Sequence, residues 1–205
     1  MKQRRWPPAE TGRAGAKGRR FGGRRYQTWL MGLTFERVSA AEGDAIVAFL
    51  RSSDWPFHRV PRLSVDEAEA ISVSNAQTDS FWMRDAGTAV GLVRLLDLDD
   101  VAYGSPLFDL RIAGEHRGRG LGTAAVRWLS SHLFGEYAVL HRIEATTRSD
   151  NAAMIRTLDR CGYHLEGVLR EAWKSSDGTR HDTMVFGLLR REWLGERENS
   201  APGTL

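Results

Sequence analysis

Cysteine is nearly absent from this 205-residue chain, in which Cys161 is the only thiol. A single thiol excludes an intramolecular disulfide framework and offers no cysteine cluster to a metal ion, so the sequence predicts no metal site and a reducing, cytoplasmic environment. The chain also lacks any run of about 18 apolar residues that would span a bilayer. Its start, MKQRRWPPAE, has basic residues without an apolar segment behind them, which predicts no secretory signal and no membrane partner.

Acidic residues are scarce in the first part of the chain, although the net charge of the whole is only +3. Residues 1–29 contain nine basic side chains against Glu10 alone and show no apolar periodicity. Such a stretch cannot offset its loss of conformational entropy by burial, so residues 1–30 are predicted to form a basic disordered extension. We interpret it as a solvated arm; the less favoured alternative is contact with RNA, because clustered arginine suits phosphate.

The rest of the chain has the composition of one folded domain. Its acidic balance argues against nucleic acid as its main ligand. Apolar content is sufficient for a single core over residues 31–195, and residues 196–205 are expected to be a flexible tail.

Strand-like and helix-like patterns alternate from Leu33 onward. Ser64 followed three residues later by Glu67 is a capping box that predicts a helix start, and Asp177-Gly178 marks the tip of a hairpin. A stripe of Leu121, Ala125, Leu129 and Leu133 predicts an amphipathic helix. Strands are expected over 33–38, on both sides of an Asp-Ala-Gly turn within 80–98, over 106–114, over 138–147 and in a hairpin within 163–189; helices are expected over 40–52, 64–77, 121–134 and 150–162.

Three glycines at alternate positions distinguish the segment EHRGRGLGTAAV, residues 115–126. The segment follows a predicted strand and opens a predicted helix, where unpaired N–H groups and the helix dipole favour an anion. Neither the dinucleotide fingerprint nor the phosphate loop with its lysine fits this spacing. A merely flexible turn needs one glycine rather than three, so the motif indicates a pyrophosphate site with arginines alongside.

The glycine segment resembles the acyl-CoA motif of the Gcn-five-related N-acetyltransferases, the GNAT superfamily. The downstream region resembles the branch that acetylates ribosomal-protein N-termini, the RimJ/RimL type, and the similarity extends over roughly residues 33 to 194. The residues that carry this second resemblance are Asn151, Gly162, Tyr163, Glu166, Gly167, Arg170, Gly178, Asp182, Glu192 and Trp193.

The resemblance implies an α/β (α+β) fold with a mixed, mostly antiparallel central sheet, flanked by helices and splayed at its middle strands. It implies acetyl-CoA as the cofactor. Asn151 would hold the cofactor from the other side of the split, although plain helix capping is the alternative. A main-chain N–H near Ile112 would stabilise the oxyanion. The implied cofactor-binding set is completed by Leu110, Arg117, Gly118, Arg119, Gly120, Leu121, Gly122 and Thr123.

The general base is less clear from the sequence than the cofactor loop. Glu144 and Asp109 are the candidate catalytic carboxylates because they lie on strands beside the expected split, and Glu115 lies in the approach to the loop. For each of them taken alone, a paired structural carboxylate is the favoured interpretation. His58 is the other candidate, in the segment DWPFHRVPR, whose aromatics indicate either an acceptor-binding loop or core.

A general acid is missing from its usual places. In enzymes of the RimJ/RimL type a serine three residues after the helix-start asparagine is the candidate donor to the leaving thiolate, and other branches place a tyrosine seven residues after it. Here these positions hold Met154 and Leu158, which donate no proton. Tyr163 and Ser149 are the next candidates.

The predicted activity is transfer of acetyl to a primary amine, with a protein or peptide N-terminus, possibly of a ribosomal protein, as the favoured acceptor. Small-molecule amines, such as a polyamine or an antibiotic, are the runner-up. A sensor that binds acyl-CoA without turnover, and a ribosome-associated RNA-binding factor, remain open. Composition is compatible with a monomer or a homodimer.

Overall fold

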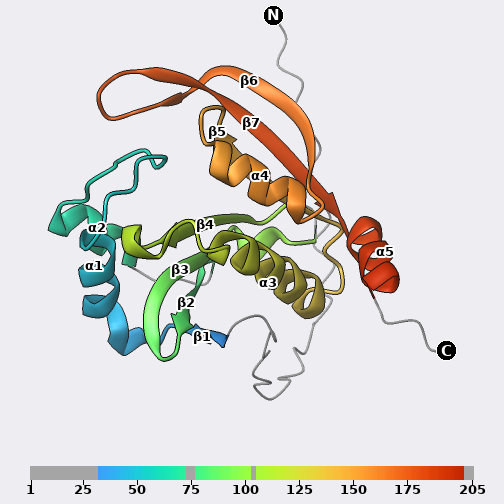
Figure 1. Ribbon diagram of the computed structural model, residues 1–205, viewed down its shortest axis with the longest axis horizontal. Coiled ribbons are helices and arrows are strands. Elements are labelled where there is room, and N and C mark those ends of the chain that lie inside the picture. The colour runs from blue at the N-terminus through green and yellow to red at the C-terminus, as the bar shows by residue number, and fades with distance from the viewer. Residues whose placement is uncertain (1–31, 73–76, 103–104, 201–205) are drawn as a thin grey trace, which may run out of the picture.

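The computed structural model describes residues 32–72, 77–102 and 105–200 (Figure 1). The expected basic extension, with its RNA-contacting alternative, lies outside the described residues, as do residues 201–205. Residues 196–200, which we assigned to a flexible tail, are helical, because the last helix continues to Ser200. No helix in the described part of the chain is long and apolar enough to cross a membrane.

The described strands form two antiparallel sheets. The first has the order β1-β2-β3-β4 and the second the order β5-β7-β6. The strands are β1 (Leu33–Arg37), β2 (Asp79–Asp85), β3 (Thr88–Leu96), β4 (Leu107–Ile112), β5 (Arg142–Arg148), β6 (His164–Lys174) and β7 (Arg180–Leu189). Each was expected from the sequence, although β5 begins four residues later than its pattern predicted.

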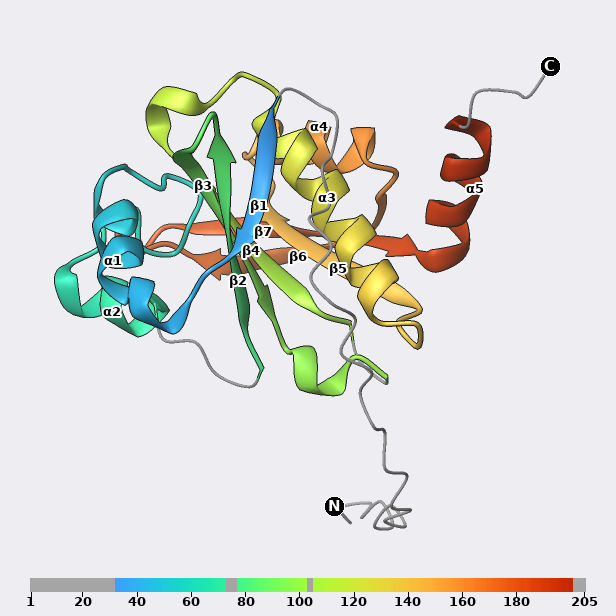
Figure 2. The same cartoon turned by 90° about the horizontal axis from the view of Figure 1, so that it is seen from below.

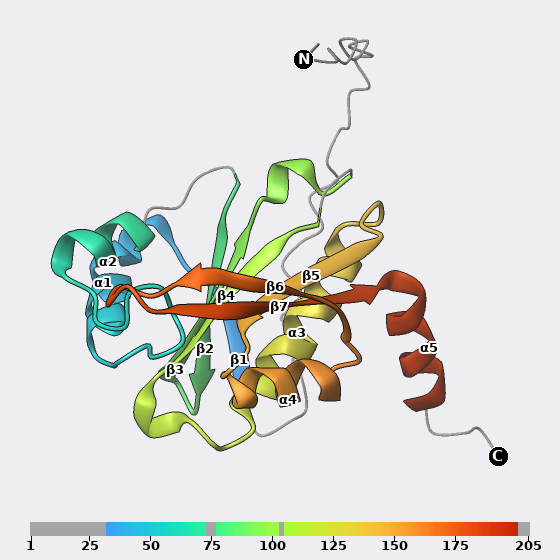
Figure 3. The same cartoon turned by 90° about the horizontal axis from the view of Figure 1, so that it is seen from above.

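Helices cover both faces of the four-stranded sheet. Figure 2 shows α1 and α2 on one side and α3 on the other. In Figures 1 and 3 the long β6–β7 hairpin reaches from α5 toward α1 and α2. The helices are α1 (Gly43–Arg51), α2 (Val65–Ser72), α3 (Leu121–Glu136), α4 (Ala152–Arg160) and α5 (Arg190–Ser200).

Two apolar cores result from the alternation of side chains along β2 and β3. Trp82 and Leu92 pack with α1 and α2, whereas Met83 and Val93 pack with α3. The predicted stripe of α3, from Leu121 to Leu133, is buried in this second core. Both faces of the sheet are therefore covered by helices.

Local turn signals in the sequence are confirmed. In the capping box the Glu67 N–H donates to Ser64 Oγ at 3.2 Å, and the Ser64 N–H donates to the Glu67 carboxylate at 2.9 Å. Ala86 and Gly87 both have positive φ, as the two-residue turn between β2 and β3 requires. Gly178 at the hairpin tip has φ of +86°.

The sheets are separated at their centre. Among the described strands, β4 pairs only with β3 and β5 only with β7, so no ladder joins β4 to β5. This is the predicted splay. In the described chain every strand pairing is antiparallel, so the predicted mixed sheet is realised as two antiparallel sheets.

One arginine holds the C-terminal end of α3. The Arg190 guanidinium donates to the carbonyl oxygens of Phe134 at 2.9 Å, Leu140 at 2.7 Å and Tyr137. It also lies over the Phe134 ring, 4.9 Å from its centroid. The bond to Phe134 pairs a carbonyl of the last helical turn, the other two join the segment after α3 to Arg190, and the guanidinium places a cation at the negative end of the helix dipole.

Replacing this arginine tests how firmly α3 is anchored. We expect Arg190→Ala to lower the free energy of unfolding by about 2–4 kcal/mol, because several charge-assisted hydrogen bonds are lost together. Urea denaturation measures the change. Arg191→Ala is the matched control, since Arg191 is exposed on the same helix, and it should change stability by less than about 0.5 kcal/mol. Equal effects of the two variants would contradict the anchoring role.

Candidate active site

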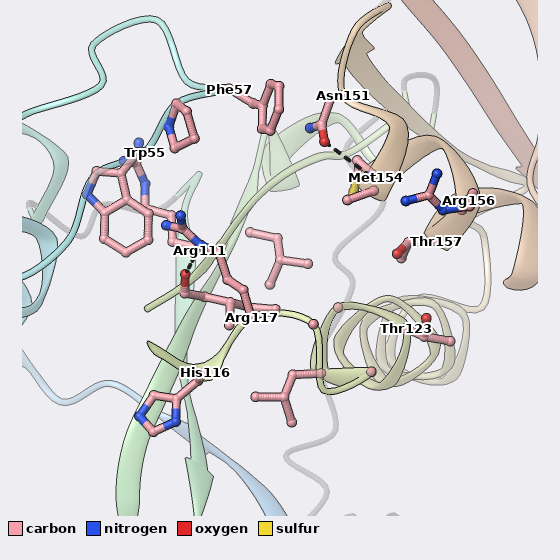
Figure 4. A pocket seen from close by; sticks show the side chains of 18 of the residues that line it. Trp55, Phe57, Arg111, His116, Arg117, Thr123, Asn151, Met154, Arg156 and Thr157 are labelled. Atoms are coloured by element: carbon pink, nitrogen blue, oxygen red, sulfur yellow. Dashed lines mark hydrogen bonds between the residues drawn. The ribbon is translucent and has the colours of Figure 1, made fainter. Parts of the chain in front are cut away.

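A cavity of about 390 Å³ lies where the two sheets separate. In Figure 4 side chains of α4 lie on one side of it and Trp55 and Phe57 on the other. The lining comes from four segments distant in sequence: Trp55, Pro56, Phe57 and His58 between α1 and α2; Leu110, Arg111 and Ile112 of β4; His116, Arg117, Gly118, Gly120, Leu121, Gly122 and Thr123; and Asn151, Ala153, Met154, Arg156, Thr157 and Arg160.

The free edge of β4 directs main-chain groups toward the split. The Ala113 N–H donates to Val90 O at 3.0 Å, so Ala113 is hydrogen bonded to the β3 side. Pairs in an antiparallel ladder alternate between bonded and non-bonded. The N–H and C=O groups of Ile112 and Leu110 therefore point away from β3. Consistently, Ile112 O accepts a bond from the Arg117 side chain at 2.9 Å rather than from β3.

The glycine segment makes a tight passage from β4 to α3. Gly118 and Gly120 have φ of +76° and +79°, a conformation that residues with a side chain rarely adopt. Gly120 is the N-cap of α3, and the first helical donor with a main-chain acceptor is Ala124 N–H, which donates to Gly120 O at 3.1 Å. The preceding N–H groups at the helix start remain available to an anion.

The two arginines of the glycine segment have different positions from those expected for phosphate ligands. The Arg117 side chain lines the cavity but donates to Ile112 O and Asp54 O, and it lies over the Trp55 ring. Arg119 is absent from the lining and donates to Asp85 at 3.1 Å. Arg117 thus fastens the loop that contains Asp54, and Arg119 fastens the β2–β3 turn.

Helix α4 supplies cations that the sequence reasoning missed. Arg156 and Arg160 line the cavity together with Ala153 and Thr157, since residues three and four apart share a helix face. The available signal for these cations in the sequence was the i, i+4 spacing of Arg156 and Arg160 on the helix that follows Asn151. The side chain of Asn151 also lines the cavity; its Oδ1 accepts from Met154 N–H at 3.2 Å, and its amide donates to Thr147 at 3.1 Å. Asn151 is therefore a helix cap as well as a lining residue.

The two candidate catalytic carboxylates have different surroundings. Glu144 is paired with Arg142 at 2.8 Å, an arginine that also contacts Glu166, and it is not among the lining residues. Asp109 is likewise absent from the lining but contacts two residues that belong to it. His58 Nε2 lies 2.8 Å from Asp109 Oδ1, and Arg111 Nε donates to Asp109 Oδ2 at 3.0 Å.

Burial alone disfavours ionisation of Asp109, yet its pKa lies well below the usual range. The hydrogen bond from His58 and the charge of Arg111 together outweigh the desolvation. Asp109 is accordingly a carboxylate that only accepts hydrogen bonds. Of the sequence candidates for the base, His58 alone lines the cavity; Glu115 is 81% exposed and lies beside His116.

The sequence left open whether the aromatic residues near His58 belong to an acceptor-binding loop or to the core. In the structure they contact both the core and the cavity. Trp55 is a core residue, with its indole N–H donating to Leu50 O at 2.6 Å, and its ring still lines the cavity. Phe57 is half-buried beneath the Arg148 guanidinium. The loop is therefore packed firmly while exposing one face to the cavity.

Comparison with known proteins decides the family. The Acetyltransferase (GNAT) family profile matches residues 47–163, which include the glycine segment and most of the cavity lining. The chain belongs to the GNAT acetyltransferase family.

Two curated relatives and a solved structure extend this result. The probable N-acetyltransferase YjcK of Bacillus subtilis is 30% identical over 128 residues, 62% of this chain and 65% of that protein. The putative ribosomal N-acetyltransferase YdaF of the same organism is 32% identical over 111 residues, 54% of this chain and 59% of that protein. The chain therefore matches less than two thirds of the length of either relative.

The solved structure confirms the fold. Spermidine N-acetyltransferase from Vibrio cholerae, in complex with CoA and spermine, superposes with a TM-score of 0.66 at 23% identity, and covers 80% of this chain and 98% of that chain. At this identity the likeness concerns the GNAT fold, which agrees with the splayed antiparallel sheets predicted from the sequence.

The residues at the cavity fit acetyl-CoA, the acyl donor of the GNAT family. Pantetheine contains amide groups that match the main-chain groups of Leu110 and the N–H of Ile112 on β4, whereas the Ile112 carbonyl is occupied by Arg117. The start of α3 offers N–H groups to a pyrophosphate, and Arg156 and Arg160 add positive charge. The pantetheine and pyrophosphate parts of CoA therefore each have complementary groups in the lining.

None of the proton donors that the sequence analysis named for the leaving thiolate lies in the described lining. Met154 lines the cavity, and Leu158 is fully buried in the core. Tyr163, our first alternative, is excluded as a donor: its hydroxyl is buried against Ser130 at 2.9 Å, and burial raises its pKa above the usual value. Ser149 is exposed and not part of the lining.

A single added methyl group tests the CoA loop. A Cβ at Gly122 would meet only ordinary contacts, 3.6 Å from Thr157 and 3.8 Å from Ile112, and its φ is not positive. We expect Gly122→Ala to keep or raise the melting temperature, because alanine favours helix, while weakening CoA binding about tenfold or more by occupying the cavity. Isothermal titration calorimetry measures the affinity.

The matched control is Gly135→Ala, at an exposed site in the same helix where a Cβ meets no atom within 4 Å. It should leave CoA affinity unchanged. Wild-type affinity in Gly122→Ala would contradict the assignment of the start of α3 to CoA.

Proposed function

We propose that this chain transfers the acetyl group of acetyl-CoA to the α-amino group of a peptide or protein N-terminus, as enzymes of the RimJ/RimL type do. The observation that carries the proposal is the convergence of the free β4 edge and the start of α3 on one cavity. A ribosomal protein is the specific acceptor suggested by the name of the relative YdaF.

Residues of the chain have separable tasks in this reaction. Acetyl-CoA supplies an acetyl thioester with a thiolate leaving group. The Ile112 N–H, directed into the split, donates to the carbonyl oxygen as negative charge develops there. The N–H groups of Leu121 to Thr123 hold the pyrophosphate, and Arg117 keeps the neighbouring loop in place.

The acidity of the acceptor favours an α-amine. An α-amino group with pKa of about 7.7–8.0 is roughly one-tenth neutral at pH 7, whereas a lysine amine near 10.4 is neutral only to a few parts in ten thousand. A site without a strong proton-transfer apparatus acts faster on the more acidic amine.

Charge in the lining supports the same choice over a polyamine. The lining residues include four arginines, Arg111, Arg117, Arg156 and Arg160, and no carboxylate among the described residues. A polycation gains little from such surroundings. Small-molecule amines are nevertheless the second candidate, because the superposed spermidine N-acetyltransferase shares the fold.

A panel of acceptors tests the proposal directly. Thiol release from acetyl-CoA is measured with N-terminal peptides, polyamines and aminoglycosides. We expect turnover on the peptides, and the acetylated α-amine is confirmed by mass spectrometry. Preference for a polyamine or an aminoglycoside would replace the proposed acceptor by the second candidate, and tight CoA binding without any turnover would indicate an acyl-CoA sensor.

The missing acid predicts a slow enzyme that a serine accelerates. Without a positioned donor, the rate is lower by about 10²-fold than with one. We expect Met154→Ser to turn over about tenfold faster on peptides with little change in CoA affinity, because Met154 lines the cavity at the first turn of α4.

Ile155→Ser is the control for a serine on α4 that is outside this cavity, and it should give no acceleration. A wild type that is already fast, with no gain from Met154→Ser, would mean that another donor is present.

A further inference from the structure

One carboxylate at the edge of the cavity holds two residues that each keep an unused polar atom. Asp109 contacts His58 through one oxygen at 2.8 Å and Arg111 through the other at 3.0 Å. His58 Nδ1 and Arg111 Nη1 are buried, and neither has a hydrogen-bond partner among the described residues. Both side chains line the cavity. A buried polar atom left unpaired in this way is costly unless a water or a ligand pairs with it.

The contact with Asp109 determines which nitrogen of His58 carries the proton. An ionised carboxylate only accepts, so the hydrogen lies on Nε2 and is donated to Asp109. In the neutral imidazole the other nitrogen, Nδ1, is then unprotonated and has a free lone pair. Arg111 is 6% exposed, and its Nε is committed to Asp109, so its unused donor is Nη1.

The loop that carries His58 is fixed from three sides. Within the loop, His58 N–H donates to Trp55 O at 2.9 Å, and Trp55 N–H donates to Pro61 O at 2.7 Å. Arg148, at the end of β5, donates to Pro56 O at 3.1 Å, and Arg117 donates to Asp54 O. The loop backbone is therefore held by Arg148 of the second sheet and by Arg117, and the imidazole by Asp109 of the first sheet.

We propose that His58 Nδ1 accepts the proton of the acceptor amine, that Asp109 is its positioning residue, and that Arg111 Nη1 binds a carbonyl or carboxylate oxygen on the carbon next to that amine. This rests on the proposed acetyl transfer and narrows its substrate class to α-amino carbonyl compounds, namely peptide N-termini and amino acids.

The proton and electron balance is complete within this arrangement. The ammonium gives one proton to His58 Nδ1, and the amine lone pair forms the N–C bond to the acetyl carbon. The C–S bond breaks with its electron pair on sulfur. The second proton lost by the nitrogen neutralises the thiolate, and His58 releases the first proton to solvent.

Arginine next to the amine also contributes through its charge. The charged groups around His58 are Asp109 and Arg111 of β4, Arg94 of β3, which acts on Asp109, and Arg117 and Arg148 on the flanking segments, where Arg148 is ion-paired with Asp150. The excess is positive, which favours a neutral amine and disfavours a second ammonium on the acceptor.

The first test reads the ring nitrogens without any turnover. Long-range ¹H–¹⁵N spectra of the uniformly labelled protein without CoA report which nitrogen of each histidine is protonated, and His58→Gln assigns the signal. We expect His58 to carry hydrogen on Nε2 and none on Nδ1 at pH 8. Hydrogen on Nδ1 would overturn the proposal, whichever amines the enzyme acetylates.

The second test is kinetic. We expect His58→Gln to lower kcat/KM on peptides at pH 7 by about 10²-fold, with the KM for acetyl-CoA changed less than about threefold, and the rate to recover as pH rises because the amine then loses its proton unaided. Asp109→Asn should reduce kcat in the same direction and yield a mixture of tautomers. His164→Gln, an exposed histidine of β6, is the control. Undiminished activity of His58→Gln overturns the proposal while leaving the acetyl transfer intact.

The third test concerns the oxygen. Arg111→Lys keeps the charge but loses the planar fork. We expect its KM to rise about tenfold or more for a peptide beginning with alanine and to stay unchanged for an alkylamine without the carbonyl. An equal rise for both amines, or a rise confined to acetyl-CoA, would contradict the role of Arg111. If the wild type acetylates no amine at all, the proposed function fails, and the tautomer measurement still decides the link between His58 and Asp109.

Discussion

The interrupted ladder between β4 and β5 is the constraint on which the site depends. An edge strand with unpaired N–H and C=O groups is ordinarily a liability that proteins cover or blunt. Here the edge of β4 faces a cavity, and Leu110 and Ile112 direct their main-chain groups into it. The surrounding structure keeps the gap open: α3 begins at one side of it and is anchored at its far end by Arg190, while the start of α4 forms the other wall. A ligand with amide groups would form the hydrogen bonds that β4 and β5 do not form with each other.

Arginine serves two purposes around this gap, and position rather than residue type decides which. Arg117 and Arg148 each donate to a backbone carbonyl of the loop that carries His58, and Arg148 also forms an ion pair with Asp150. Arg156 and Arg160 are exposed residues of α4 that line the cavity. Arginine therefore has two roles around the cavity. Arg117 and Arg148 hold the loop that carries His58, whereas Arg156 and Arg160 provide positive charge on α4. A substitution in the first pair would disturb the geometry of His58, whereas one in the second pair would act through electrostatic attraction alone.

Sequence predicted the parts of the molecule that depend on near neighbours. The capping box at Ser64, the turn at Gly178 and the positive φ of Gly118 and Gly120 follow from local backbone chemistry, so their patterns were sufficient. The pairing of side chains was not predictable in the same way. Asp109 and His58 are 51 residues apart in the sequence. Nothing in either segment indicates that the Asp109 carboxylate accepts a hydrogen bond from the His58 imidazole. Glu144 had an equally suggestive position on β5, but Arg142 two residues earlier neutralises it. Tertiary packing gives these two carboxylates different partners, which the sequence could not distinguish.

The proposed site has a group that accepts a proton from the acceptor amine but no positioned group that donates one to the leaving thiolate. The chemistry of the amine and of the thiolate explains why the reaction can proceed with only the first. A thiol has a pKa of about 8.5, so a thiolate departs without a strong acid. Met154 in place of a proton donor therefore slows the reaction without preventing it. The acceptor is different, because an ammonium has no lone pair and cannot attack at all. A positioned base therefore raises the rate more at the amine than a positioned acid does at the sulfur. In this chain the buried carboxylate of Asp109 is spent on orienting His58, on the side of the cavity where a proton must leave before any bond forms.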